Sequence, residues 1–380
     1  MQPLAVYIHW PFCARICPYC DFNVYKSKGE AGDDLVAAIA ADLKYWRSVT
    51  GPRALTSIHF GGGTPSLMTP AQIDTLITAC QDLWSAAPDI EIGLEANPDD
   101  ANADIWRGYK AAGLNRLSVG IQSFDDEVLK FLGRNHDGAS ARGALKLACE
   151  IFENVSADLI FGHTGQRGAA WEADIDAALA FPITHLSAYQ LTIEERTAFG
   201  RAAQRGKALD VDEDMSAALY ELTTQKMSAA GFTHYEISNY ARPNNTRPDH
   251  RSAHNMAYWT GFDYVGVGPG AHGRVTTDKG RLATIAQMSP SAYIKAVYET
   301  GRAVDEAEPL SADESAEEYV MMGLRIHEGL DLNHRALSGR TLISQGLEDE
   351  GWLVREGHRL KATEKGRLVL NEITRRLLTG

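Results

Sequence analysis

Apolar runs and segments of helical periodicity alternate over the first half of the chain. The runs have the length of strands and lie at residues 5–10, 55–60, 91–95, 116–121, 155–160 and 185–191. Between them, apolar residues recur every three or four positions, which predicts helices at 34–48, 70–86, 103–112, 138–153 and 171–181. This order predicts a parallel sheet with right-handed crossovers. Six units are fewer than a closed barrel of eight requires, so we expect an open, partial (β/α)6 barrel.

The pattern changes after about residue 194. We expect a charged helix at 213–230, a helix plus linker at 280–309, and helices around a hairpin at 352–360. The last unit has the helix–turn–helix–hairpin order that is typical of a winged helix. We therefore predict three domains, at 1–195, 196–309 and 310–380, with the third a small α+β domain.

The segment 265–273 reads Val-Gly-Val-Gly-Pro-Gly-Ala-His-Gly. No helix or strand needs so many glycines. Close approach of the backbone to another backbone or to a ligand explains them better.

Composition narrows the class of protein. The chain has 380 residues, 44% of them apolar, and a formal charge of −13. This acidic balance argues against nucleic acid as a partner, so we interpret the winged-helix-like unit as a packing module. No apolar stretch approaches the roughly 20 residues of a transmembrane helix, and the first residues do not resemble a secretory signal. Cys80 and Cys149 fall in helical patterns and are expected to be free thiols, which suits a reducing cytoplasm.

The other three cysteines lie within eight residues, at Cys13, Cys17 and Cys20. They follow the first apolar run, where Pro11 predicts a loop. A loop can direct three thiolates at one [4Fe-4S] cluster, and three ligands leave one iron open to a small molecule. Two alternatives are buried cysteines on one face of a helix, which Pro11 and Pro18 disfavour, and a Cys3His zinc site that uses His9.

Polar and glycine residues also follow the other strands of the predicted sheet. Gly61–Pro65 follows the second strand, Glu95–Pro98 the third and Gln122 the fourth, and Asp158 lies late in the fifth. Ligands of parallel α/β sheets bind at the carboxyl ends of the strands, so we expect one site at this edge. Glycines allow backbone groups to approach the charged amino-acid end of a ligand. Glu95 needs a cationic partner, either from the ligand or from Arg116 or Arg134.

The C-x3-C-x2-C spacing and the Gly-Gly-Gly-Thr-Pro segment resemble the radical S-adenosylmethionine (SAM) superfamily. The resemblance implies that Cys13, Cys17 and Cys20 bind the cluster in the first domain and that SAM chelates the open iron. It also implies that the residues in contact with SAM are Tyr7, Tyr19, Gly62, Gly63, Thr64, Glu95, Gln122, Arg134 and Asp158. In such proteins the reduced cluster cleaves SAM to methionine and a 5′-deoxyadenosyl radical, so the cofactor carries that chemistry.

Within this superfamily the chain resembles the oxygen-independent coproporphyrinogen III oxidases and their relatives, the HemW-type heme chaperones. The similar segments are at 7–13, 60–65, 94–98, 118–124, 132–134, 158–162 and 265–273. Three features favour the chaperone branch: Phe22 replaces a further cysteine of the oxidases, only six residues precede Tyr7, and residues 254–259 read His-Asn-Met-Ala-Tyr-Trp.

The resemblance implies that His254 takes part in heme binding, with Tyr258 and Trp259 against the macrocycle. The alternative is a histidine buried by hydrogen bonds beside two core aromatic residues. We expect heme as cargo, acceptor hemoproteins such as respiratory-chain components as partners, and a cytoplasmic location. The competing functions are oxidative decarboxylation of coproporphyrinogen III and a zinc-binding adaptor without catalysis.

Overall fold

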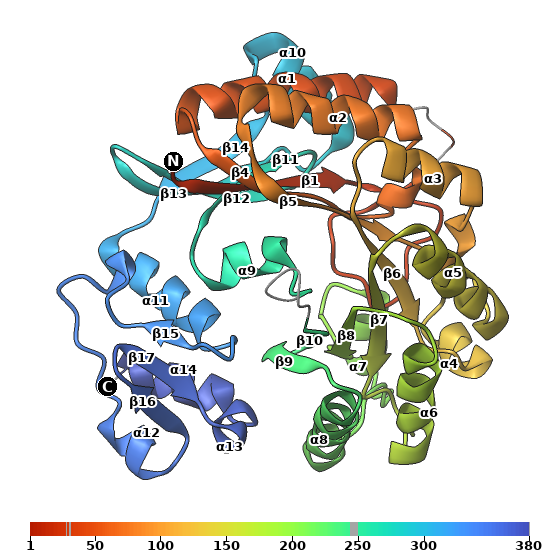
Figure 1. Cartoon of the computed structure of the whole chain (residues 1–380), viewed down its shortest axis with the longest axis vertical. Helices are drawn as coiled ribbons and strands as arrows, with labels where there is room; N and C mark the ends of the chain where they lie inside the picture. The colour runs from red at the N-terminus through yellow and green to blue at the C-terminus, as the bar shows by residue number, and fades with distance from the viewer. Residues whose placement is uncertain (28, 30–31, 244–249, 380) are drawn as a thin grey trace.

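The computed structural model describes residues 1–27, 29, 32–243 and 250–379. Six parallel strands occupy the centre of a 12-stranded sheet (Figure 1). They are β1 (Pro3–Trp10), β4 (Ala54–Gly62), β5 (Ser85–Ala96), β6 (Arg116–Gln122), β7 (Asn154–Phe161) and β8 (His185–Gln190). They pair in this order, each parallel to the next. The predicted parallel sheet is confirmed, and the described strands form an open sheet rather than a closed barrel.

Five helices lie in the predicted crossovers: α1 (Asp33–Thr50), α2 (Pro70–Leu83), α3 (Ala103–Ala111), α5 (Gly138–Ile151) and α6 (Gly168–Leu179). Thr69 caps α2 in a reciprocal capping box with Gln72. The prediction for α2 was too long, because the helix ends at Leu83 and β5 begins at Ser85. Trp84 between them is extended and buried, and its Nε1 donates to Thr50 Oγ1 at 3.0 Å. A short helix that we did not predict, α4 (Asp126–Phe131), follows β6.

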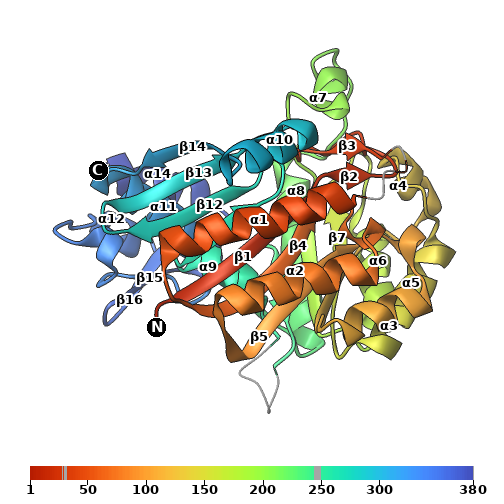
Figure 2. The same ribbon diagram turned by 90° about the horizontal axis from the view of Figure 1, so that it is seen from above.

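The two faces of the central sheet differ sharply in chemistry. Side chains alternate between faces along a strand, so residues paired in register share a face. One face is apolar and is covered by helices, as Figure 2 shows for α1 and α2. The residues on this apolar face include Leu4, Val6, Ile8, Ile58, Phe60, Leu94, Leu117, Val119 and Ala157. The concave face is polar in every strand and includes Tyr7, His9, Ser57, His59, Glu91, Glu95, Arg116, Ser118, Ser156, Asp158 and Ser187. Ligand-binding groups therefore line the inside of the curved sheet.

Residues 196–309 extend this sheet at both edges. At one edge, after α7 (Ala198–Ala203) and α8 (Glu213–Ala229), β10 (Asn239–Ala241) pairs with β8, and β9 (Thr233–Glu236) follows. At the other edge, β11 (Asp263–Val267) pairs parallel with β1. It is followed by β12 (His272–Thr277), β13 (Gly280–Ala286) and β14 (Val304–Pro309), all antiparallel. The helix α9 (Ala253–Trp259) lies inside the curve of the sheet (Figure 1).

The prediction of a helix plus linker at 280–309 was right for the helix and wrong for the linker. The segment holds two strands, β13 and β14, around the helix α10 (Pro290–Thr300). The strand β14 reads Val-Asp-Glu-Ala-Glu-Pro and is almost wholly exposed. An edge strand needs no apolar face, and charged side chains protect it from pairing with other chains, so its sequence resembles a linker.

The glycine-rich segment at 265–273 approaches its neighbours as expected. A Cβ atom added to Gly266 would lie 2.0 Å from the His272 carbonyl oxygen. A Cβ atom on Gly268, at φ +98°, would lie 2.2 Å from the His9 carbonyl oxygen. Only hydrogen fits at these positions, so the glycines let β11, β12 and the end of β1 pack backbone against backbone.

The last 70 residues form a small α+β unit around a three-stranded sheet, β15 (Leu330–Asp331), β17 (Arg359–Ala362) and β16 (Leu353–Glu356). Its helices are α11 (Ala312–Gly323), α12 (Gln345–Asp349), α13 (Glu364–Arg367) and α14 (Leu370–Thr379). A separate apolar cluster, including Val320, Leu330, Leu360 and Ile373, holds the unit together. The predicted winged-helix-like fold is confirmed, whereas the domain boundaries at 195 and 309 stay predictions.

Residues 242–251 are rich in proline, asparagine and arginine, which predicts a loop, and residues 244–249 of this segment lie outside the described residues. No helix in the described part of the chain is both long and apolar enough to span a lipid bilayer.

Candidate functional site

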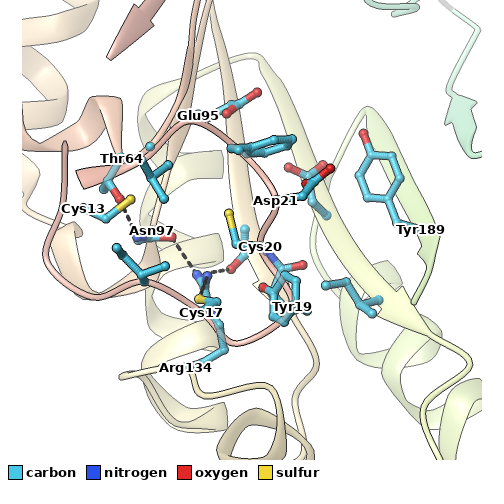
Figure 3. A pocket seen from close by; sticks show the side chains of 18 of the residues that line it. Cys13, Cys17, Tyr19, Cys20, Asp21, Thr64, Glu95, Asn97, Arg134 and Tyr189 are labelled. Atoms are coloured by element: carbon cyan, nitrogen blue, oxygen red, sulfur yellow. Dashed lines mark hydrogen bonds between the residues drawn. The ribbon is translucent and has the colours of Figure 1, made fainter. Parts of the chain in front are cut away.

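A cavity of about 470 Å³ lies at the carboxyl ends of the central strands. It is lined by Cys13, Cys17 and Cys20 and by eight of the nine residues expected to contact SAM: Tyr19, Gly62, Gly63, Thr64, Glu95, Gln122, Arg134 and Asp158. We call it the cysteine cavity. Figure 3 shows the three cysteines around one space, with Asn97 and Arg134 on one side and Tyr189 on the other. The prediction that these strand ends converge is confirmed.

Backbone hydrogen bonds hold the cysteine loop against the sheet. The two-residue strand β2 (Phe12–Cys13) pairs with β3 (Tyr25–Lys26), which closes the loop at its base. Gly63 N–H donates to the Trp10 carbonyl at 2.7 Å, and Thr64 N–H donates to that of Phe12 at 2.8 Å. A Cβ atom on Gly63 would lie 2.7 Å from the Phe12 carbonyl oxygen, so this position requires glycine. The triple glycine therefore joins the loop to β4 as well as lining the cavity.

Two of the three thiols, those of Cys13 and Cys20, are shielded from solvent. Burial raises the pKa of Cys13 and raises that of Cys20 to about 11, so both are protonated at neutral pH and would release protons on binding iron. Within the described residues, no three His, Cys, Asp or Glu side chains lie close enough to hold a single metal ion.

The zinc alternative that used His9 has no geometric support. His9 Nδ1 lies 3.0 Å from the Tyr7 hydroxyl, and His9 Nε2 lies 2.9 Å from the Asn23 carbonyl oxygen. Both ring nitrogens are thus hydrogen bonded, and the ring borders a different cavity from the one the cysteines line.

A chain of hydrogen bonds fixes one wall of the cysteine cavity. Arg134 Nη2 donates to Asn97 Oδ1 at 2.6 Å, and Asn97 Nδ2 donates to Thr64 Oγ1 at 3.2 Å. Arg134 Nη1 lies 3.5 Å from Cys17 Sγ. Arg134 Nε is buried and has no hydrogen-bond partner within the described part of the chain. Asn97 was not among the predicted contact residues, although it lies in the Glu95–Pro98 segment.

Glu95 pairs with neither Arg116 nor Arg134, the two partners expected for an internal ion pair. Its carboxylate accepts from Gly62 N–H at 3.3 Å and lies 3.2 Å from His59 Nε2. Arg116 bonds instead to Asn154, and Arg134 to Asn97. The Glu95 side chain is 42% exposed, toward the cavity, where a cationic ligand would find it.

Asp158 lies on the opposite wall among serine hydroxyls. Ser118 Oγ donates to its carboxylate at 2.6 Å and Ser156 Oγ at 3.0 Å. Burial raises the pKa of Asp158, and the hydrogen bonds from these serines oppose that rise. The carboxylate is thus held in place while it still borders the cavity.

Gln122 reaches the cavity through an unusual backbone. It is the one residue other than glycine with positive φ, at +65°, within the described residues. The register between β6 and β7 shifts just before it, between Val119 and Gln122. A left-handed residue with a side chain costs about 1–2 kcal/mol, which is typical of positions kept for function.

We expect Gln122→Gly to leave the free energy of unfolding unchanged or to raise it by up to about 1 kcal/mol, because glycine adopts this φ without strain. Gln122→Ala should be less stable than Gln122→Gly, because alanine keeps the strain. Urea unfolding of both variants measures this difference. Equal stability of the two variants would show that the backbone at residue 122 is not strained.

Tyr7 and His254 do not line the cysteine cavity. Tyr7 borders a second cavity of about 460 Å³, formed by β1, β11 and β12 with α9 and α11. We call it the second cavity. It is lined by Tyr7, His9, Asp21, Phe22, Asn23, Tyr258, Trp259, Tyr264, Gly270, His272, Arg274, Arg281, Met288, Glu318 and Met322. Asp21 and Phe22 line both cavities, so the cysteine loop separates them.

His254 is buried, with 1% exposed surface. Its Nδ1 lies 3.2 Å from Ser57 Oγ and its Nε2 lies 2.6 Å from the Tyr258 hydroxyl. Its ring stacks on His59, with centroids 4.7 Å apart. This arrangement matches the alternative of a histidine buried beside aromatic residues, and His254 lines neither of the two cavities described. A direct bond from His254 to heme stays a prediction that would need the side chain to move.

Comparison with known proteins gives consistent matches over the whole chain. Residues 7–178 match the radical SAM superfamily model, and residues 310–369 match the HemN C-terminal domain model. The heme chaperone HemW of Escherichia coli K12 is 36% identical over 98% of this chain and 97% of its own length. HemW of Mycobacterium tuberculosis H37Rv is 35% identical over 99% and 95%. Radical S-adenosyl methionine domain-containing protein 1, mitochondrial, of Bos taurus is 33% identical over 100% and 88%.

Among solved structures, the coproporphyrinogen III oxidase HemN of Escherichia coli matches with a TM-score of 0.80 and 22% identity. The match covers 100% of this chain and 90% of HemN. At this identity the likeness establishes the fold.

Proposed function

The chain belongs to the HemW-type branch of the radical SAM superfamily, and on this basis we propose that it binds a [4Fe-4S] cluster, SAM and heme and delivers heme to acceptor hemoproteins. The observation that carries the proposal is the cysteine cavity, where three thiols meet Gly62, Gly63 and Glu95 at one edge of the sheet. We further propose a cytoplasmic location, with respiratory hemoproteins among the acceptors.

In this proposal Cys13, Cys17 and Cys20 hold the cluster, which when bound supplies an open iron for SAM and an electron for its cleavage. Glu95 faces the cavity with its carboxylate and would accept from the ammonium group of SAM. Arg134 lines the same cavity, and its guanidinium group would pair with the carboxylate of the same ligand. Tyr19 offers an aromatic face for the adenine.

The proposal favours a chaperone over an oxidase. Phe22, where the oxidases carry a further cysteine, is 60% exposed and borders both cavities. A phenyl ring can contact a flat apolar ligand but cannot ligate iron.

The test is anaerobic reconstitution of the full chain with iron and sulfide, followed by two assays on the same sample. Titration with hemin should give a saturable Soret shift at about one heme per chain. Incubation with SAM, a reductant and coproporphyrinogen III should give no protoporphyrinogen. Turnover of coproporphyrinogen would reverse this assignment in favour of the oxidase. Failure to take up hemin would remove the chaperone function.

A further inference from the structure

We propose that heme binds in the second cavity and that His272, rather than His254, is its axial ligand. This inference rests on the proposed function and assigns the site of the cargo. Three independent features of the cavity support it: its aromatic walls, its excess of arginine and the one histidine that its hydrogen bonds leave available.

The walls suit a flat aromatic macrocycle. Tyr258 and Trp259 enter from α9, and Tyr264 from β11. Tyr258 and Tyr264 pack edge to face, with centroids 4.4 Å apart. Met288 and Phe22, which are 47% and 60% exposed, add apolar surface at the opening. A volume of about 460 Å³ is within the range of small-molecule and cofactor sites.

One end of the cavity carries an excess of positive charge in an otherwise acidic chain. We define the arginine cluster as Arg53, Arg274, Arg281 and Arg335, of which Arg274 and Arg281 line the cavity. The four guanidinium groups pair with only two carboxylates. Asp263 lies within 3.6 Å of Arg53, Arg281 and Arg335, and Glu318 lies within 3.6 Å of Arg274 and Arg281. Heme carries two propionates, whose charge would balance this excess through contacts with the guanidinium groups of Arg274 and Arg281.

The cavity has two histidines on its walls, His9 and His272. His9 uses both ring nitrogens in hydrogen bonds. His272 begins β12 and is exposed, and within the described residues its ring nitrogens have no hydrogen-bond partner. It lies two residues before Arg274 on the same strand, so both side chains project from the same face of the sheet. An imidazole next to two guanidinium groups is the arrangement that iron and propionates of one heme require.

In this proposal His254 does not contact heme itself and affects heme binding through Tyr258. Its hydrogen bond to the Tyr258 hydroxyl fixes an aromatic wall of the second cavity. It is a positioning residue, and its loss should weaken heme binding without changing the atom that ligates iron.

The experiment compares the reconstituted full chain with His272→Ala, His254→Ala and the control His358→Ala, an exposed histidine in the turn between β16 and β17. Hemin is titrated into each, and the iron ligand is identified by electron paramagnetic resonance and resonance Raman spectroscopy. We expect His272→Ala to lose the nitrogen-ligand signature and at least about tenfold in hemin affinity. Added imidazole should restore the signature. His254→Ala and His358→Ala should keep the signature.

Two further measurements separate the iron ligand from the walls. Metal-free protoporphyrin IX should bind wild type and His272→Ala equally, because it has no iron to ligate. Arg274→Gln should weaken hemin and protoporphyrin IX alike, because both carry propionates. If His272→Ala binds hemin with the wild-type spectrum and affinity, or if His254→Ala loses the nitrogen signature, the inference is wrong and the proposed chaperone function stands. If the wild-type chain binds no hemin, the proposed function itself fails.

Discussion

Replacing Cys13, Cys17 and Cys20 together by serine should give a folded chain that retains neither cluster nor SAM. The three thiols are the sulfur donors that line the cavity, and a serine hydroxyl is a poor ligand for iron. Reconstituted wild type should carry about four irons and four sulfides per chain, and the variant close to none. SAM affinity, measured by equilibrium dialysis under anaerobic conditions, should fall at least about a hundredfold, because the chelating iron is lost.

Cys149→Ser is the matched control, since Cys149 is a partly buried free thiol in α5, outside the cavity. This variant should reconstitute as wild type does. Circular dichroism of both variants checks that the fold is intact. A triple variant that still bound four irons would contradict the assignment of these thiols as ligands, and the same loss in Cys149→Ser would mean that the assay reports general damage.

Gly266→Ala should destabilise the chain by about 3 kcal/mol or more. The added methyl group would meet the His272 carbonyl oxygen at 2.0 Å, and Gly266 pairs with Tyr7 on the other side, so neither strand can move without breaking the ladder. Urea unfolding measures the effect. Because φ at Gly266 is not positive, the loss would report collision alone.

Gly143→Ala is the control for this prediction. Gly143 lies in α5, and a Cβ atom there would have no neighbour within 4 Å. Alanine is favoured over glycine in a helix, so the free energy of unfolding should rise by up to about 1 kcal/mol. Opposite signs for the two substitutions are expected. Similar small effects would show that β11 and β12 are less tightly packed than described.

The sequence predicts the central sheet because its strands are apolar on one face and polar on the other. The six runs with strand character all pair as expected, and helices fall between them. The strand β14 was not predicted because it lies at the edge of the sheet, where exposure removes the apolar signal. The strand β13 lies between β12 and β14 and is partly buried, so exposure does not explain why it was missed. The pairing of β11 with β1 joins segments about 250 residues apart, and no local pattern contains that information.

The candidate site likewise has a part that the local sequence predicts and a part that depends on distant segments of the chain. Residues at the ends of consecutive strands could be placed together because parallel strands share one carboxyl edge. Tyr7 and His254 could not be placed, because their position depends on which side of the cysteine loop each faces. A sequence signal for the second cavity was present: His272 and Arg274, two residues apart, lie at the end of the glycine-rich segment 265–273 and directly after it. This signal could not be interpreted from the sequence alone, because the other walls of the cavity come from α9 and α11, in other parts of the chain.

The shared wall between the cavities has a consequence for regulation. Asp21 and Phe22, the two residues directly after Cys20, line both cavities. Any ligand that reorders these two side chains from one side alters the other side as well. Thermodynamic reciprocity then requires that if bound SAM raises the affinity for heme by some factor, bound heme raises the affinity for SAM by the same factor. The release of heme would thus be coupled to whether SAM is bound.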